Sequence, residues 1–388
     1  MKLSVIITTY NRANLLEQLL NDLSAQFVML SPSEEMEIET FIVDNNSTDN
    51  TSSVVYKFIE DNRLRIKYIS EEQQGISAAR NAAIKEAKGS LLAFIHDDVS
   101  LDEDWLREVF KIADTCIDHE IGIYGGRSIP LWEDTLPEWL NIEAPSAIAQ
   151  EAFSGHSYGD EEKFYPFESE FGSAKFPSGV NFLVRREIFN NCGDFRTDLG
   201  ANAAGGFGTH DDYEFFEYLS TINVPMLYVP QCIVFHPVSP DTLTMQNIRK
   251  WYFKAGRSLY WIAHTDRLKR KAPEFVGLSE DEKSFFPEFS KKYINSVPIY
   301  LNLKIIFLLF EIIYSLILFD KKKVNYLSFE LSKILGAINA AELISQKTRS
   351  KKFSFKDRIK KKTIDLDDEA LKESPAEQDD EKASVEVD

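Results

Sequence analysis

Two copies of the triplet His-Asp-Asp, at residues 96–98 and 210–212, are the most chemically informative feature of this sequence. The first follows an apolar run, residues 91–95, with the pattern of a buried strand, and the second follows a glycine-rich segment, residues 205–208. Carboxylates at the end of a buried strand are costly to hold without a cation or a proton as partner. Acids and imidazoles grouped in this way bind metal ions and transfer protons. The triplets therefore indicate an enzyme with a metal site and a catalytic carboxylate.

Each triplet also has a plainer interpretation. Residues 96–98 could be a capped strand end, although adjacent acids directly after an apolar run favour the functional interpretation. Asp211 and Asp212 could simply open a helix, where negative charge is favoured by the helix dipole. A helix N-terminus and a catalytic role are compatible, so both interpretations of the second triplet stay open.

The elements that must position these residues follow the pattern of a parallel sheet covered by helices. Leucines at helical spacing predict a helix over residues 15–23, and a short helix is expected over residues 81–87. Runs of β-branched residues predict strands over residues 4–8, 39–43, 65–69 and 91–95. In such sheets, ligands bind beyond the carboxyl ends of the strands. The polar clusters that follow three of these strands, residues 9–12, 44–47 and 96–98, are therefore expected to converge.

Composition narrows the class of protein. The 388 residues carry a formal net charge of −18, which argues against nucleic acid as a partner because phosphate backbones are bound by an excess of Lys and Arg. Cys116, Cys192 and Cys232 form no Cys-x-x-Cys pair, so neither a disulfide framework nor a zinc cluster is expected. The apolar run after Met1 is too short for a signal peptide, which predicts a cytoplasmic protein.

The carboxyl-terminal part has a different character. Residues 299–319 are mostly apolar, and Lys304, Glu311 and Ser315 fall on one face of a helix. With the basic residues that continue to position 362, this pattern predicts reversible attachment through residues 299–362 to the cytoplasmic face of an anionic membrane. A spanning helix and an ordinary buried helix pair remain alternatives.

Four motifs in order, residues 5–12, 43–49, 75–81 and 94–98, together resemble the nucleotide-sugar-dependent family 2 glycosyltransferases of bacterial polysaccharide type. The resemblance continues through residues 179–186, the second triplet and His236, and so covers about residues 3–260. It implies the GT-A fold, which is an α/β, Rossmann-like, mixed and mainly parallel sheet flanked by helices. The carboxyl-terminal helices lie outside the resemblance.

The resemblance also implies roles for particular residues. The divalent metal, Mn²⁺ or Mg²⁺, is expected at Asp98, and His236 matches a position where relatives supply a metal or phosphate contact. The residues expected to bind the nucleotide-sugar donor are Thr8, Tyr10, Arg12, Asp44, Gly75, Arg80 and Asp97. One departure is His96, where relatives often carry Asp, and this could weaken activity.

The acceptor side is expected to use the second triplet. Asp212 matches the family's catalytic base, which would take the proton of the attacking hydroxyl and invert the anomeric centre. Asp211 and Glu214 match its acidic neighbours, and Asn181 lies in a further matching motif. Trp132, in the insertion of residues 130–177, offers an aromatic face for a sugar ring, although packing is the simpler role. The acceptor is expected to be a glycan or a lipid-linked saccharide.

These observations predict three regions. Residues 1–270 form the catalytic domain, with a donor half at 1–125 and an acceptor half at 126–270. Residues 271–345 form a helical and membrane-associated region, and residues 346–388 form a basic and then acidic disordered tail. Two other functions stay open, a non-catalytic nucleotide-sugar-binding protein and a metal-dependent phosphoesterase.

Overall fold

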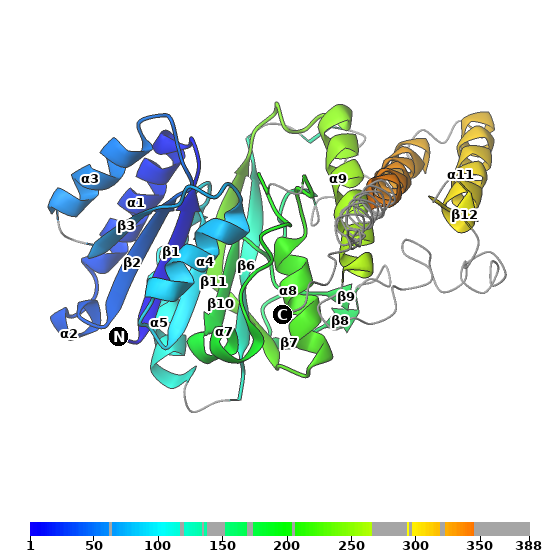
Figure 1. Ribbon diagram of the computed structural model, residues 1–388. Coiled ribbons are helices and arrows are strands. Elements are labelled where there is room, and N and C mark those ends of the chain that lie inside the picture. The colour runs from blue at the N-terminus through cyan, green and yellow to red at the C-terminus, as the bar shows by residue number, and fades with distance from the viewer. Residues whose placement is uncertain are drawn as a thin grey trace, which may run out of the picture.

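The computed structural model gives one chain with a central sheet and helices on both of its faces (Figure 1). The residues that it describes are 1–61, 64–116, 120–133, 136–137, 152–168, 174–203, 206–265, 293–294, 297–318 and 323–344. The predicted tail over residues 346–388 lies outside them, as does most of the basic run that ends at residue 362.

The sheet has the strand order β3-β2-β1-β4-β10-β6-β11-β5, and β7 pairs with β11. Strands β1 to β4 run parallel, whereas β10 enters antiparallel between β4 and β6. This arrangement is the mixed and mainly parallel sheet expected from the sequence. The strands are β1 (Leu3–Thr9), β2 (Ile38–Asp44), β3 (Ile66–Ser70), β4 (Leu91–His96), β5 (Ser100–Leu101), β6 (Ile123–Trp132), β7 (Lys163–Tyr165), β10 (Asn181–Arg185) and β11 (Met226–Val238).

Helices bury the two faces of this sheet in separate cores. One core lies under α1 (Ala13–Phe27), α3 (Thr51–Asp61) and α5 (Trp105–Thr115), and the other under α4 (Ile76–Glu86), α7 (Arg186–Cys192) and α8 (Asp211–Thr221). The second core is rich in phenylalanines whose rings contact one another edge-on or tilted, which include Phe182, Phe195 and Phe215. The short elements are α2 (Pro32–Glu35), β8 (Phe167–Glu168), β9 (Ala174–Lys175), β12 (Tyr293–Ile294) and β13 (Val297–Pro298).

The strands predicted over residues 4–8, 39–43, 65–69 and 91–95 are confirmed to within one residue at each end. The helix expected over residues 81–87 is also present, but it begins earlier, at Ile76. Gly75 has φ of 130° and turns the chain directly into the helix, so the preceding loop is shorter than the sequence pattern indicated.

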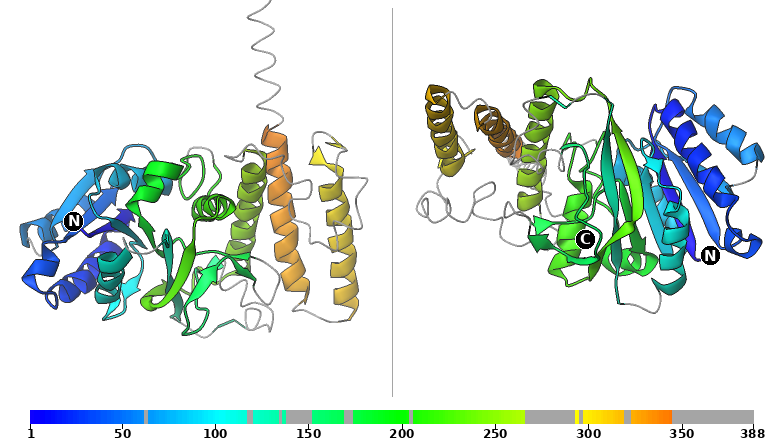
Figure 2. Two further views of the ribbon diagram at one scale, coloured as in Figure 1. Left: turned by 90° about the horizontal axis from the view of Figure 1, so that it is seen from below. Right: turned by 180° about the vertical axis from the view of Figure 1, so that it is seen from behind.

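Three helices stand side by side beyond the sheet: α9 (Met245–His264), the helix over residues 323–344, and α11 (Ile299–Ile317) (Figures 1 and 2). The helix over residues 323–344 lies between the other two, and Tyr260, Leu308 and Ile334 belong to the core that they share. It meets α9 at two glycines. A Cβ atom on Gly256 would lie 1.8 Å from the carbonyl oxygen of Lys333, and one on Gly336 would lie 2.0 Å from that of Phe253. The two backbones are therefore in direct contact.

Helix α11 points its polar residues toward the protein. Lys304 and Ser315 are buried, whereas Phe307, Phe310 and Ile317 are exposed. The single polar face predicted from the sequence is therefore present, and the apolar face is turned outward. Within the described residues, no helix is long and apolar enough to cross a membrane.

Candidate active site

The loops after β1, β2 and β4 meet at one edge of the sheet, as the sequence predicted. The backbone N–H of Asn11 donates to Ser47 Oγ at 2.8 Å, and the N–H of Thr48 donates back to Asn11 Oδ1 at 2.7 Å. From the same turn, Arg12 Nη1 contacts Asp97 Oδ1 at 2.9 Å and Asp98 Oδ2 at 2.5 Å. These bonds fix the three loops around one site.

Asp44 and Gly75 line the second part of this edge. The carboxylate of Asp44 accepts the N–H of Ser47 at 2.9 Å and the hydroxyl of Tyr68 at 2.7 Å. Gly75 donates its N–H to Asn45 Oδ1 at 2.8 Å, and a side chain there would crowd the backbone of Ala203. Asp44 therefore stabilises the turn over residues 44–47, and each of its carboxylate oxygens still has a lone pair for a ligand. Nearby, Thr8, which precedes the end of β1 at Thr9, is half-buried, and Tyr10 is exposed.

Asp98 lies between two imidazoles. Its Oδ1 atom is buried without a hydrogen-bond partner and is 3.7 Å from both His96 Nδ1 and His236 Nε2. Burial would raise the pKa of Asp98, but His236, His96 and Arg12 together hold it well below its ordinary value. Burial lowers the pKa of His96 to about 3, so this imidazole is neutral with a lone pair to share. Burial also raises the pKa of Asp97 to about 6 against the charge of Arg12.

The donor set suits a divalent cation, because a carboxylate oxygen and neutral imidazole nitrogens are ligands for Mn²⁺. As arranged, no group of three or more His, Cys, Asp and Glu side chains in the described part of the chain is close enough to hold a metal ion unaided. A cation between Asp98 and the two imidazoles would therefore need further ligands or a small movement of these side chains.

Arg80 joins the two His-Asp-Asp triplets. The side chain is buried, and its Nη1 atom contacts Asp211 Oδ2 at 2.8 Å. Its Nη2 atom donates to the carbonyl oxygen of Gly179 at 2.8 Å and lies 3.3 Å from His96 Nε2. One guanidinium therefore holds the end of β4 against the beginning of α8.

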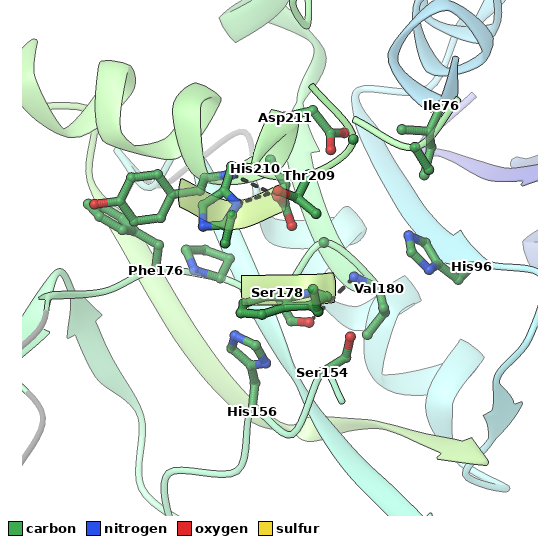
Figure 3. A pocket seen from close by; sticks show the side chains of 18 of the residues that line it. Ile76, His96, Ser154, His156, Phe176, Ser178, Val180, Thr209, His210 and Asp211 are labelled. Carbon is green, nitrogen blue, oxygen red and sulfur yellow. Dashed lines mark hydrogen bonds between the residues drawn. The ribbon is translucent and has the colours of Figure 1, made fainter. Parts of the chain in front are cut away.

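A cavity of about 510 Å³ opens beside this link. Its walls include His96 and Arg80 on one side and Asp211 and Asp212 on another, and Figure 3 shows His96 and Asp211 facing the hollow. Asp212 Oδ1 accepts the N–H of Tyr213 at 2.8 Å. Before it, His210 has a left-handed backbone with φ of 67°, which turns the chain into α8. The cavity therefore presents a carboxylate from the second triplet and an imidazole from the first.

Three residues expected on the acceptor side do not line this cavity. Asn181 is buried and donates from Nδ2 to the carbonyl oxygen of Cys232 at 2.8 Å, while its Oδ1 accepts from Trp105 Nε1 at 3.1 Å, so its amide locks the core. Glu214 is buried 3.8 Å from Arg196. Trp132 packs against Phe153 with ring centroids 5.6 Å apart, which is the simpler role considered for it. Of the residues expected on the acceptor side, Asp211 and Asp212 lie at the cavity.

Several lining residues carry no motif that the sequence could reveal. His156 and Lys175 come from the insertion over residues 130–177, Trp251 from α9, and Lys333 from the helix over residues 323–344. They are far apart in the sequence, and none stands in a distinctive pattern of polar residues. Only the packing of α9 against its neighbours brings them together.

We predict that Gly179→Ala lowers turnover with little effect on folding. A Cβ atom at Gly179 would lie 2.0 Å from Asp212 Oδ2, so the carboxylate must move. A displacement of about 1 Å can reduce kcat by about a hundredfold. The measurement is kcat beside a thermal melt, and Gly208→Ala is the matched control because its Cβ would meet only Lys254, at 3.6 Å. Equal kcat for both variants would contradict this prediction.

Comparison with known proteins agrees with this fold. The sequence profile described as Glycosyl transferase family 2 matches residues 4–193. The glycosyltransferase AglE of Haloferax volcanii is 27% identical over 268 residues, which are 68% of this chain and 75% of AglE. The poly(ribitol-phosphate) beta-N-acetylglucosaminyltransferase TarS of Staphylococcus aureus is 29% identical over 147 residues, which are 36% of this chain and only 24% of TarS.

Among solved structures, the mannosyltransferase PcManGT from Pyrobaculum calidifontis, in complex with GDP-Man and Mn²⁺, matches with a TM-score of 0.52. Its sequence identity is 17%, and the match covers 87% of this chain and 86% of that one, so it supports the GT-A fold alone. With the family match, the fold and a cavity that joins both triplets, residues 4–193 are identified as a family 2 glycosyltransferase domain, and the chain as a glycosyltransferase that uses a nucleotide-sugar donor.

Proposed function

We propose that this enzyme is a metal-dependent, inverting glycosyltransferase that moves a sugar from its nucleotide donor to a hydroxyl of a glycan or lipid-linked saccharide. The observation that carries the proposal is the link through Arg80, which holds His96 and Asp211 at one cavity. A donor bound beside the first triplet would therefore present its sugar toward Asp212.

The donor binds along the edge formed by the loops after β1, β2 and β4. Thr8, Tyr10 and Asp44 hold the base and ribose, and Asp97 takes a ribose hydroxyl. Gly75 lets the backbone approach the donor closely. Arg12, about half exposed beside Asp97 and Asp98, offers positive charge to the diphosphate. Arg80 was expected to bind the donor, but its contacts favour a positioning role between the triplets.

Asp98 and His236 would hold the divalent cation, with His96 beside them. The unpartnered Asp98 Oδ1, 3.7 Å from each imidazole, is the observation that fits a cation there. When bound, the cation neutralises charge on the diphosphate leaving group. The neutral state of His96 makes its replacement of Asp compatible with this role.

Asp212 acts as the general base. Its carboxylate lies at the cavity, and its removal of the acceptor proton strengthens the attack of the hydroxyl oxygen on the anomeric carbon. Attack from the face opposite the leaving nucleoside diphosphate inverts the anomeric configuration. Asp211 does not compete for this role, because Arg80 holds it in an ion pair.

The outer helices complete the acceptor side of the enzyme. The helix over residues 323–344 supplies Lys333 to the cavity, so the region over 271–345 contributes to the site of the catalytic domain over residues 1–270. We further propose that the exposed apolar face of α11 rests on the cytoplasmic surface of a membrane, with the nearby basic residues toward anionic lipid.

A donor panel tests the proposed function. We expect one nucleotide-sugar to raise the melting temperature in the presence of Mn²⁺ or Mg²⁺, and to be hydrolysed slowly without an acceptor. Addition of EDTA should abolish this hydrolysis, and the sugar transferred to an acceptor should have the opposite anomeric configuration to the donor. Binding without turnover would instead support the non-catalytic alternative. Cleavage of p-nitrophenyl phosphate with no effect of any nucleotide-sugar would support the phosphoesterase.

A further inference from the structure

Part of the cavity is unused by the proposed chemistry. Lys175 of β9, His156 and Lys333 line it together with the two triplets, and in Figure 3 His156 lies across the hollow from Asp211. Asp98, Arg12 and His236 are not among its lining residues. This part of the cavity is therefore separate from the proposed diphosphate position and borders the space that an acceptor would occupy.

The charges in this part of the cavity do not cancel. Lys175 is only 7% exposed, and within the described residues neither it nor Lys333 forms an ion pair with a carboxylate. Asp211 is already paired with Arg80, which leaves Asp212 as the other carboxylate among the lining residues, together with two lysines. Lys175 is buried, and a single free carboxylate balances two lysines, so the lining carries an excess of positive charge that favours an anionic ligand.

The neighbouring histidines do not add to this charge. Burial, together with the charge of Lys175, lowers the pKa of His156 to about 4, and burial beside Lys333 lowers the pKa of His210 to about 3. Both imidazoles are therefore neutral near pH 7 and can share hydrogen bonds with a bound ligand. The two lysines remain the positive groups of this part of the cavity.

The number and placement of the cations favour one class of anion. Lysine is a compact point charge that binds phosphate oxygens from different directions, whereas the planar fork of arginine matches carboxylate and phosphate alike. Lys175 and Lys333 come from separate elements, which fits a tetrahedral group whose oxygens point in several directions. We propose that the acceptor carries a phosphate ester, which Lys175 and Lys333 bind while the acceptor hydroxyl faces Asp212. This inference rests on the proposed transfer reaction and names its acceptor class.

Calorimetric titration with sn-glycerol 3-phosphate tests the inference, with nucleoside diphosphate and metal present at saturation. We expect saturable binding to the full chain, weakened about tenfold by Lys333→Gln and by Lys175→Gln, and no binding of glycerol or gluconate. Lys250→Gln is the matched control because Lys250 is exposed on α9 and does not line the cavity. Dihexanoyl phosphatidic acid, used as a monomer, forms a second arm, and tighter binding than glycerol 3-phosphate would identify a lipid phosphate as the source.

Nucleoside diphosphate binding separates this inference from the proposed function. It is measured on the parent chain and on the variants Lys333→Gln, Lys175→Gln and Lys250→Gln. If all four bind the nucleotide equally, unchanged binding of glycerol 3-phosphate to the lysine variants would overturn the phosphate site. Displacement of glycerol 3-phosphate by the nucleotide, or preference for gluconate, would also overturn it. Failure of every protein to bind any nucleoside diphosphate would instead count against the transferase mechanism. Lys333 is partly exposed, so Lys333→Gln remains decisive if the Lys175 variant does not fold.

Discussion

Asp212→Asn is expected to reduce kcat for sugar transfer by about a thousandfold, within the range of about 10² to 10⁴ typical of a lost general base. The substitution keeps the size of the side chain and the Oδ1 atom that accepts the N–H of Tyr213, so α8 should start as before. Only the capacity to take a proton is removed. Donor affinity, measured by calorimetry with the nucleoside diphosphate, should stay within about twofold of the parent value because the residue acts in the transition state.

Asp241→Asn is the matched control for this variant, since Asp241 is an exposed carboxylate away from the cavity. It should retain full kcat. If Asp212→Asn keeps more than about a tenth of the parent activity while it melts normally, Asp212 is not the base. A parallel fall in kcat and in nucleotide affinity would instead indicate that the substitution disturbs the donor site.

The sequence predicts the donor half of this enzyme well. Strands β1, β2 and β4 are apolar runs with polar residues directly after them, and a parallel sheet brings such strand ends to one edge. Arg12, Asp97 and Asp98 therefore meet in the structure as expected. This part of the site follows from local pattern and from sheet topology, and both are visible in a single sequence.

The acceptor half could not be predicted in the same way. Lys333 reaches the cavity that Lys175 also lines from a helix that two glycines, Gly256 and Gly336, bring into contact with α9. Nothing in the local sequence of either lysine signals this contact. Asn181 shows another limit of the sequence, because its position in a matching motif did not reveal that its amide bonds to Cys232 and Trp105. Long-range packing decides each of these cases.

Arg80→Gln is expected to destabilise the folded protein by about 3–5 kcal/mol, because it leaves the carboxylate of Asp211 buried without its partner. The Arg80 and Asp211 side chains are 3% and 9% exposed, so solvent offers little compensation. The change in the free energy of unfolding is measured by chemical denaturation. Arg107→Gln, which removes an exposed ion pair with Asp104, is the control and should cost no more than about 1 kcal/mol.

The pH dependence distinguishes a lost ion pair from lost packing. Burial already raises the pKa of Asp211 to about 6, with Arg80 opposing the rise. Without Arg80, this pKa moves further above its unfolded value, so the folded variant binds more protons than the unfolded chain and loses stability as pH rises. The cost of Arg80→Gln should therefore be larger at pH 8 than at pH 5.

A second substitution tests whether Arg80 acts through Asp211. In the double variant that combines Arg80→Gln with Asp211→Asn, neither charge of the buried ion pair remains. Much of the lost free energy of unfolding should therefore return, and the added pH dependence of Arg80→Gln should disappear. Turnover should not return, because His96 and α8 no longer share the guanidinium that holds the first triplet against the second. If turnover recovers together with stability, Arg80 supports the fold alone and the two halves of the site are aligned by other contacts.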